Sequence, residues 1–352
     1  MCAPEDVGNV AAAMPRPAPG PAVDPIALAP VDEVSITTLM DNAYDGLLTD
    51  GPGPTGQVTR GGLHLGRVPA AHCVDGYAVS GLRAEHGFAA LVTVRVADRE
   101  HRLVFDTGLT PDGMVVNADR LQIPLTDVRA VVMSHGHFDH AGGLVGMAGR
   151  KGPASLPLVL HPYSWARRRF ETPGGEFVFP TMSKKTLIAE GFDVIERRIP
   201  SLLLDDAVLI TGEVDRATDF ERGMPPPHQA WTGDHWEHDP LVIDDQALVV
   251  NVRGRGLVVL TGCGHAGVVN IVRHAMRLTG VDRLAALIGG FHLGGPAFEP
   301  VIPPTLDELQ AWQPQLVVPG HCTGWKAQHA LAARLPGAFV PGSSGSTYQV
   351  AS

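Results

Sequence analysis

Residues 134–143 read Ser-His-Gly-His-Phe-Asp-His-Ala-Gly-Gly, a short segment rich in metal-binding side chains. The apolar, β-branched run at 128–133 directly before it predicts a buried strand. His135 and His137 follow that strand two residues apart, so their side chains are expected to point to the same side. Residues 141–144 then predict the first turn of a helix, which would bring Asp139 and His140 to a neighbouring point. Two adjacent ligand sets in one loop predict a two-metal site, and the alternative is a chance cluster of histidines.

The length, composition and charge of the chain are those of an ordinary globular protein. Its 352 residues are 44% hydrophobic and 18% charged, which is enough to bury a sizeable core. The net charge of −10 argues against nucleic acid or an anionic membrane as the main partner, so we expect a small-molecule substrate. Nothing in the sequence indicates an oligomeric state.

Targeting and redox features predict a cytoplasmic protein. No apolar run approaches the length that spans a bilayer, and the N-terminus does not have the pattern of a signal peptide. The cysteines Cys2, Cys73, Cys263 and Cys322 lack the spacing of a disulfide framework. Because Cys263 and Cys322 lie beside histidines, proximity to a metal is the favoured interpretation for both.

The chain is expected to divide into a tail and one domain. Residues 1–30 are rich in Ala and Pro and predict a flexible tail, and residues 31–352 predict a single domain. Thr305 and Glu308 suggest a capping box at the start of a second predicted helix. The main predicted strands are 34–40, 89–96, 101–105, 157–161, 192–199, 207–210, 247–252, 256–260, 284–288 and 315–319, and the helices are 268–278 and 305–312.

One arrangement recurs along the chain: an apolar strand, a turn of small residues, and then a polar side chain that can bind a metal. Ligands at the same edge of a sheet can converge on one point. A single histidine of this kind is often structural, but several together favour convergence. The residues so placed are Asp106, His135, His137, His161, Cys263, His265, His292 and His321.

These motifs resemble those of the metallo-β-lactamase superfamily. The matching stretches are Asp106-Thr-Gly, His135-Gly-His-Phe-Asp-His140, Thr261-Gly-Cys263 and Pro319-Gly-His321. More narrowly, the chain resembles the 7,8-dihydropterin-6-methyl-4-(ribofuranosyl)aminobenzene 5′-phosphate synthase-like metal-dependent hydrolases. That likeness is carried by Ala84-Glu-His-Gly-Phe88, Thr211-Gly-Glu213 with Arg216, Thr261-Gly-Cys-Gly-His265, Gly289-Gly-Phe-His-Leu293 and Pro319-Gly-His-Cys-Thr-Gly324. The resemblance implies an α/β fold of the αββα sandwich type, with two mixed β-sheets flanked by helices.

The resemblance also implies two ligand sets. One metal would bind His135, His137 and His265, and another would bind Asp139, His140 and His321. The family commonly has a carboxylate that bridges the two metals where this chain has Cys263. The bridging ligand here would be Cys263, Asp244 or Asp245, or there would be none. Asp139 would also orient the nucleophile, and Asp106 would hold a histidine in one tautomer. We expect two Zn2+ ions, because Zn2+ suits these donor types. Mn2+ or Fe2+ would also fit them.

Five further residues are candidates for substrate binding. We expect His86, His161 and His292 either to face the substrate or to be hydrogen-bonded structural histidines. Glu213 and Arg216 are expected either to bind polar groups of the substrate or to lie in a solvated loop. The expected activity is hydrolysis of an ester, thioester, lactone or phosphoester by a metal-activated water. The alternatives are a transferase that condenses a pterin pyrophosphate with an arylamine phosphate, and a non-catalytic metal-binding protein of the same fold.

Overall fold

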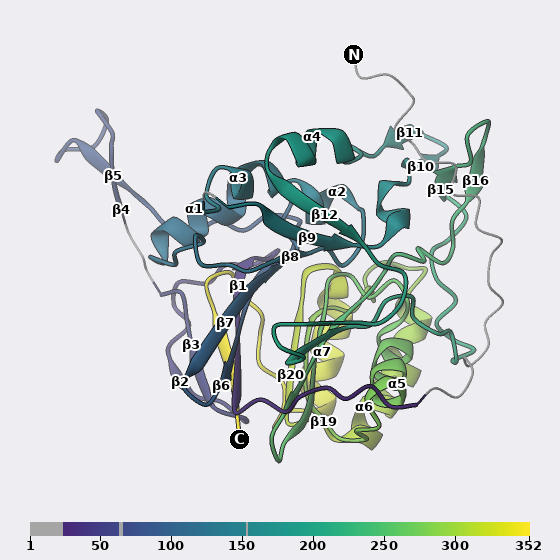
Figure 1. The fold of residues 1–352 in the computed structure, drawn as a ribbon. Helices are drawn as coiled ribbons and strands as arrows, with labels where there is room; N and C mark the ends of the chain where they lie inside the picture. The colour runs from purple at the N-terminus through teal and green to yellow at the C-terminus, as the bar shows by residue number, and fades with distance from the viewer. Residues whose placement is uncertain (1–23, 63–65, 153) are drawn as a thin grey trace.

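The computed structural model describes residues 24–62, 66–152 and 154–352, and within them two large β-sheets pack face to face (Figure 1). The first sheet is antiparallel on one side and parallel on the other, with β7 at the change. In spatial order its strands are β12 (Phe192–Glu196), β9 (Leu156–Leu160), β8 (Val131–Val132), β7 (Arg99–Phe105), β6 (Ala89–Val96), β1 (Glu33–Met40), β21 (Thr347–Ala351), β3 (Gln57–Thr59) and β2 (Gly51–Pro52).

The second large sheet is also mixed. Each of its first four strands is antiparallel to the next, and the fourth strand is parallel to the fifth and sixth. In order they are β13 (Ser201–Leu203), β14 (Val208–Ile210), β17 (Leu248–Val252), β18 (Gly256–Thr261), β19 (Leu284–Gly290) and β20 (Leu316–Gly320).

Helices cover the outer face of each sheet (Figure 1). Those on the first sheet are α1 (Gly113–Arg120), α2 (Phe138–Ala141), α3 (Leu144–Ala148) and α4 (Lys184–Ala189). Those on the second are α5 (Val268–Thr279), α6 (Ile302–Trp312) and α7 (Trp325–Arg334). The predicted αββα sandwich of two mixed sheets is therefore confirmed.

Strand β18 shows why the sequence produces these layers. Val258 and Leu260 point into the core between the two sheets, whereas Leu257 and Val259 point toward α5 and α6. Alternate side chains of a strand face opposite sides of its sheet, so a strand covered on both faces is apolar throughout. The uninterrupted apolar runs noted in the sequence are the central strands of a sandwich.

Parallel strands explain how distant candidate ligands reach one edge. Strands β7, β8 and β9 are parallel in the first sheet, and β18, β19 and β20 are parallel in the second. The carboxyl ends of parallel strands lie at the same edge of a sheet. The residues that follow these ends are Asp106, His135, His137, His161, Cys263, His265, His292 and His321.

Two smaller sheets complete the fold. One has the order β11 (Gly175–Val178), β10 (Arg168–Thr172), β15 (His228–Trp231) and β16 (Trp236–His238), and it supplies aromatic side chains above the shared edge. The other is the hairpin of β4 (Gly66–Pro69) and β5 (Tyr77–Ser80), which extends away from the sandwich (Figure 1). Short 3-10 helices lie at η2 (Pro162–Trp165), η3 (Glu299–Val301) and η4 (His321–Thr323).

The helix predicted at 141–144 is in fact two short helices. Helix α2 begins directly after His137, so Asp139 and His140 lie inside it, and α3 begins only at Leu144. Gly142 and Gly143 lie between them, and a Cβ at Gly142 would lie 1.8 Å from the carbonyl oxygen of Leu109. The glycine allows the metal motif to pack directly on the loop that follows β7.

Two other expectations differ from the structure. Residues 1–23 of the predicted tail lie outside the described residues, but Ile26 N–H donates to the Leu278 carbonyl at 2.7 Å and Leu28 is buried beside α5. Packing thus starts before residue 31. Helix α6 begins at Ile302, earlier than predicted, so Thr305 does not cap it and instead donates to the Val301 carbonyl at 2.8 Å.

Candidate metal centre

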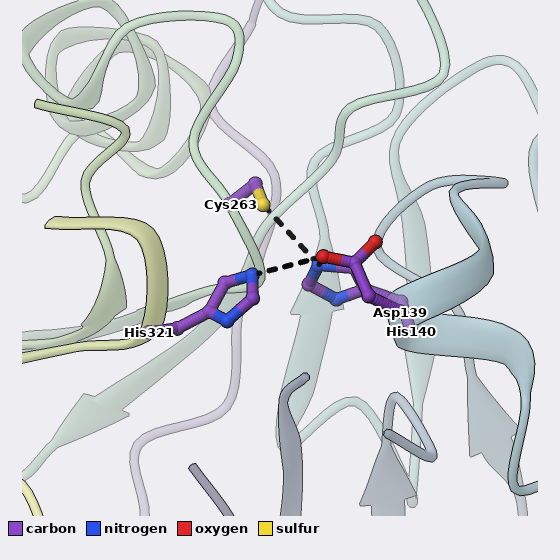
Figure 2. A group of neighbouring side chains, drawn as sticks. All are labelled: Asp139, His140, Cys263 and His321. Carbon is purple, nitrogen blue, oxygen red and sulfur yellow. Dashed lines mark hydrogen bonds and ion pairs between the residues drawn. The ribbon is translucent and has the colours of Figure 1, made fainter. Parts of the chain in front are cut away.

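Four donor side chains meet where the edges of the two large sheets face each other. The ligand atoms of Asp139, His140, Cys263 and His321 all lie within 4.8 Å of one another, and all four residues are buried (Figure 2). Asp139 Oδ2 is 3.4 Å from His321 Nε2, and His140 Nε2 is 3.2 Å from Cys263 Sγ. This group contains the second predicted ligand set together with Cys263.

A second donor group adjoins the first and shares Cys263 with it. It consists of His135, Cys263 and His265, whose ligand atoms also lie within 4.8 Å of one another. His135 Nε2 and His265 Nε2 are 3.2 Å apart. His137 packs against both histidines, with ring centroids 4.5 Å from that of His135 and 4.8 Å from that of His265. His135 and His265 of the first predicted set thus share a donor group with Cys263, and His137 packs beside that group without belonging to it.

Asp106 orients two of these histidines. Its backbone has a φ of 58°, and its buried carboxylate accepts hydrogen bonds from the Ser134 N–H and hydroxyl, both at 2.6 Å. Its Oδ2 also lies 2.7 Å from His140 Nδ1, while the Ser134 Oγ lies 2.9 Å from His135 Nδ1. If both Nδ1 atoms carry the proton, both Nε2 lone pairs face the donor groups, as metal binding requires.

His321 is held by the loop after β1. Its N–H donates to Asp41 Oδ1 at 2.6 Å, and its Nδ1 lies 3.0 Å from Asn42 Oδ1. Asn42 also contacts His86, whose Nε2 is 3.7 Å from Asp139 Oδ2. The predicted substrate residue His86 therefore stands at the mouth of the site, with its side chain 64% exposed.

His228 is a residue of the site that the sequence did not suggest. Its Nε2 lies 3.0 Å from His137 Nε2, and its Nδ1 lies 2.8 Å from the Asp239 carbonyl oxygen. His228 opens β15, ninety-one positions from His137 along the chain. No motif surrounds it, so only the packing of the small sheet over the sandwich reveals it.

Cys263 belongs to both donor groups, whereas Asp244 and Asp245 belong to neither. Asp244 accepts from the Gly136 N–H at 2.8 Å and forms a buried ion pair with Arg168. Asp245 accepts from the Ala266 N–H at 2.7 Å, and burial raises its pKa to about 7. Both aspartates thus fix the backbone beside the candidate ligands: Gly136 lies between His135 and His137, and Ala266 follows His265.

Of the other predicted substrate residues, His292 alone reaches the cavity. Its ring lies 4.2 Å from that of His265, measured between centroids. His161 is buried, accepts from the Tyr163 N–H at 3.0 Å and faces Glu213 at 3.1 Å. Arg216 is buried and donates to the carbonyls of His265 and Leu241. His161, Glu213 and Arg216 are thus not brought to the cavity, because their polar groups are used within the fold.

The chemistry of the donors fits a divalent metal. Burial, with the neighbouring histidines adding to it, holds the pKa values of His135, His137 and His265 well below the usual range. Neutral imidazoles have lone pairs to offer. Buried ring nitrogens that lack hydrogen-bond partners are costly. In the described part of the site, His265 Nδ1 and His292 Nδ1 are such atoms, and His321 Nε2 has only its 3.4 Å ion pair with Asp139. Outside the site His101 Nδ1 also lacks a hydrogen-bond partner.

The charged members of the group also suit a cation. Burial opposes ionisation of Asp139, but His140 and His321 lower its pKa below the usual range. Burial likewise opposes a charge on His140, but Asp106 and Asp139 raise its pKa to about 9. Protonated His140 therefore carries a proton where a metal ion would bind, and metal binding would release that proton.

A cavity of about 340 Å³ opens above the donor groups. Asp139, Cys263, His265 and Cys322 lie on its floor. Among the described residues no lysine or arginine lines it. Its walls are largely apolar and aromatic: Phe138, Phe170, Phe177, Phe179, Met224 and Phe298.

A second cavity, of about 410 Å³, adjoins the first. The two share His265, His292, Ala297 and Phe298. The second is lined in addition by Glu221 and Arg222. The two adjoining cavities together could hold two separate parts of one ligand, one in each cavity.

Comparison with known proteins gives consistent results. The family model described as the metallo-β-lactamase superfamily matches residues 86–271. The 7,8-dihydropterin-6-methyl-4-(β-D-ribofuranosyl)-aminobenzene-5′-phosphate synthase of Methanocaldococcus jannaschii is 27% identical, covering 70% of this chain and 83% of that protein. An uncharacterized protein of the same organism is also 27% identical, over 74% of this chain and 92% of its own length.

Among solved structures, the fold is similar to that of Tm1679, described as a metal-dependent hydrolase of the β-lactamase superfamily. The TM-score is 0.66 at 22% identity, covering 91% of this chain and all of that one. Within the described residues, no helix has the length and apolar character needed to cross a bilayer.

Proposed function

Because this chain belongs to the metallo-β-lactamase superfamily, we propose that it is a metal-dependent hydrolase of a small molecule that contains an ester, thioester, lactone or phosphoester bond. The observation that carries the proposal is the convergence of two buried donor groups joined through Cys263, with Asp139, Cys263 and His265 reaching one cavity. Membership of the fold family alone would not support a hydrolase activity, because proteins with one fold can have many functions.

The donors would hold two divalent ions, with zinc as the first choice. His135, His137 and His265 would bind one ion, and Asp139, His140 and His321 the other, with the Cys263 thiolate between them. Imidazole, carboxylate and thiolate donors suit zinc, and manganese or iron(II) could bind the same nitrogen and oxygen atoms. When bound, such ions supply Lewis acidity and make a water molecule acidic enough to act as a nucleophile near neutral pH.

Asp139 would orient the attacking water, and His86 would accept the proton that this water loses. Asp139 is ionised because of its lowered pKa, so its carboxylate can accept a hydrogen bond from the attacking water and orient it. Burial and His321 lower the pKa of His86, so its imidazole is neutral near pH 7. At 3.7 Å from Asp139 Oδ2 and partly open to solvent, the neutral His86 can accept the proton that the water loses and pass it to solvent.

The cavity favours a substrate with an apolar or aromatic part next to the bond that breaks. Five phenylalanines and Met224 form its wall, and apolar surface of this kind binds apolar groups by excluding water. Among the described residues no lysine or arginine lines this cavity to hold a free phosphate, and Arg222 lies in the adjoining cavity instead. We therefore rank aryl and acyl esters, thioesters and lactones above phosphoesters.

A panel of substrates tests this proposal. Protein loaded with zinc should hydrolyse aromatic or long-chain esters, thioesters or lactones, and His135→Ala and His321→Ala should lower kcat by at least about a hundredfold by loss of metal-ion catalysis. Phe179→Ala should raise KM for aromatic substrates more than for acetyl esters of the same leaving group. Absence of bound metal after loading, measured by elemental analysis, would contradict the proposal.

A transferase that joins a pterin pyrophosphate to an arylamine phosphate is the second candidate. The synthase from M. jannaschii and the pair of adjoining cavities support it, because a condensation needs room for two substrates. Product that forms only when an arylamine acceptor is added would favour this reaction over hydrolysis. Metal binding without turnover in either assay would instead favour a non-catalytic metal-binding protein.

A further inference from the structure

Two cysteines meet beside the donor groups. Cys263 follows β18 and Cys322 lies in η4 after β20, and β19 runs between these two strands. A Cβ at Gly290 of β19 would lie 2.8 Å from Cys322 Sγ and 3.2 Å from Cys263 Cα. The missing side chain of Gly290 therefore provides the space in which the two cysteines approach each other.

The cysteines are already in contact. Cys322 Sγ donates a hydrogen bond to the Cys263 carbonyl at 3.3 Å, and the ligand atoms of Cys263, His292 and Cys322 lie within 4.8 Å of one another. A disulfide needs a sulfur–sulfur distance of about 2 Å, so a short movement of the side chains would bring the sulfurs together. Both cysteines line the 340 Å³ cavity, through which a small oxidant can reach them.

A purely structural explanation accounts for only part of this arrangement. A buried cysteine such as Cys263, which is 3% exposed, can serve as a small apolar residue. Cys322 is different because it is partly exposed at the cavity wall and faces both Cys263 and His292. A second thiol at that place is better explained by reaction with the first.

We propose that Cys263 and Cys322 are an oxidation site, at which a hydroperoxide converts the two thiols to a disulfide. The Cys322 sulfur would attack the peroxide, the O–O bond would break, and one molecule of water or alcohol would leave as a sulfenic acid forms. The Cys263 sulfur would then displace water from that sulfenic acid and form the S–S bond. With hydrogen peroxide, two thiols and one peroxide thus give one disulfide and two waters.

Oxidation would remove a donor from both groups at once. Cys263 belongs to the group with Asp139, His140 and His321 and to the group with His135 and His265. A disulfide sulfur has lost the thiolate charge that binds a metal. This consequence, unlike the chemistry of the disulfide, rests on the proposed metal centre.

The test uses the full chain carrying Cys2→Ser and Cys73→Ser, so that Cys263 and Cys322 are the remaining cysteines. After treatment with hydrogen peroxide, the denatured protein should contain no reactive thiol. Its mass should fall by that of two hydrogens, and a linked peptide should contain both cysteines. A reducing phosphine should restore both thiols. Further substitution by Cys263→Ser or Cys322→Ser should abolish the linked peptide. The Cys263→Ser variant should accumulate a sulfenic acid on Cys322 that a dimedone probe traps, whereas the Cys322→Ser variant, which lacks the attacking sulfur, should not.

Zinc content separates this proposal from the proposed function. The reduced protein should bind zinc, the oxidised protein should bind at least about tenfold more weakly by loss of one ligand, and reduction should reverse the change. Two thiols that survive peroxide, or that oxidise without a linked peptide, would overturn the oxidation site. A disulfide that leaves zinc affinity unchanged would overturn its coupling to the metals. Reduced protein that binds no zinc would overturn the proposed function instead.

Discussion

His137 and His228 face each other through their Nε2 atoms at a distance of 3.0 Å. The Nδ1 of His228 lies 2.8 Å from the Asp239 carbonyl oxygen, which can only accept a hydrogen bond. His228 therefore carries its proton on Nδ1, and its Nε2 accepts from His137 Nε2. This leaves the lone pair of His137 on Nδ1, the nitrogen that remains for a metal.

His228→Ala should weaken zinc binding about 10- to 100-fold while the fold is retained, because His137 would lose the partner that sets its tautomer. Competition with a chromophoric chelator measures the affinity, and circular dichroism checks the fold. His329→Ala, on the exposed side of α7, is the matched control and should bind zinc normally. Unchanged affinity in His228→Ala would show that His137 needs no such partner.

Asp106→Asn should also reduce metal affinity by about 10- to 100-fold. The amide keeps the shape of the carboxylate, but it cannot accept all three hydrogen bonds that Ser134 and His140 make with Asp106. It also removes the charge that raises the pKa of His140. The same chelator titration measures this effect, with Asp112→Asn at an exposed ion pair as control. Equal affinities for the two variants would contradict the orienting role of Asp106.

Arg168→Met should lower the free energy of unfolding by about 3–5 kcal/mol, because it leaves buried carboxylates without their partner. Arg168 is 1% exposed and pairs with both Asp239 and Asp244. Urea unfolding measures the loss. Adding Asp244→Asn should recover part of it, whereas Arg150→Met, at an exposed pair with Asp119, should cost less than about 1 kcal/mol. Equal losses for the two arginines would be inconsistent with a buried network.

Glu221 should make the protein less stable as the pH rises from about 4.5 to about 7. Burial raises its pKa to about 7, although its carboxylate accepts from the Val269 and Asn270 N–H groups. In this window the unfolded state loses the proton and the folded state keeps it, so stability falls by up to about 3 kcal/mol.

Glu221→Gln removes that titration, so between pH 5 and 7 the free energy of unfolding of the variant should fall less with rising pH, or rise more, than that of the wild-type protein. Asp245, whose pKa is also raised to about 7, contributes a slope of the same sign in both proteins, whereas the buried histidines with lowered pKa values contribute one of the opposite sign. The difference between the two curves therefore isolates Glu221. Chemical denaturation of both proteins across this range gives the comparison. An identical slope in the wild-type protein and the variant would show that Glu221 is already ionised in the folded state.

Local sequence patterns predicted much of the sandwich. The hairpin of β6 and β7, the pair β17 and β18, and α5 follow from the alternation or helical spacing of apolar residues, which depends on neighbours along the chain. Strand β21 was not predicted, although it is inserted between β1 and β3. Its placement depends on strands some three hundred residues earlier, which no local pattern encodes.

The sequence by itself determined the types of the candidate donor residues and their order along the chain. His135, His137, Asp139 and His140 lie in one loop, so their proximity follows from covalent connection. Only the tertiary structure decided that Cys263, not Asp244 or Asp245, lies between the two donor groups, that His228 faces His137, and that Cys322 meets Cys263. Those contacts arise because parallel strands of two sheets end at facing edges, and side chains distant in sequence share a small volume there. Such proximity is a property of packing, which spacing along the chain does not specify.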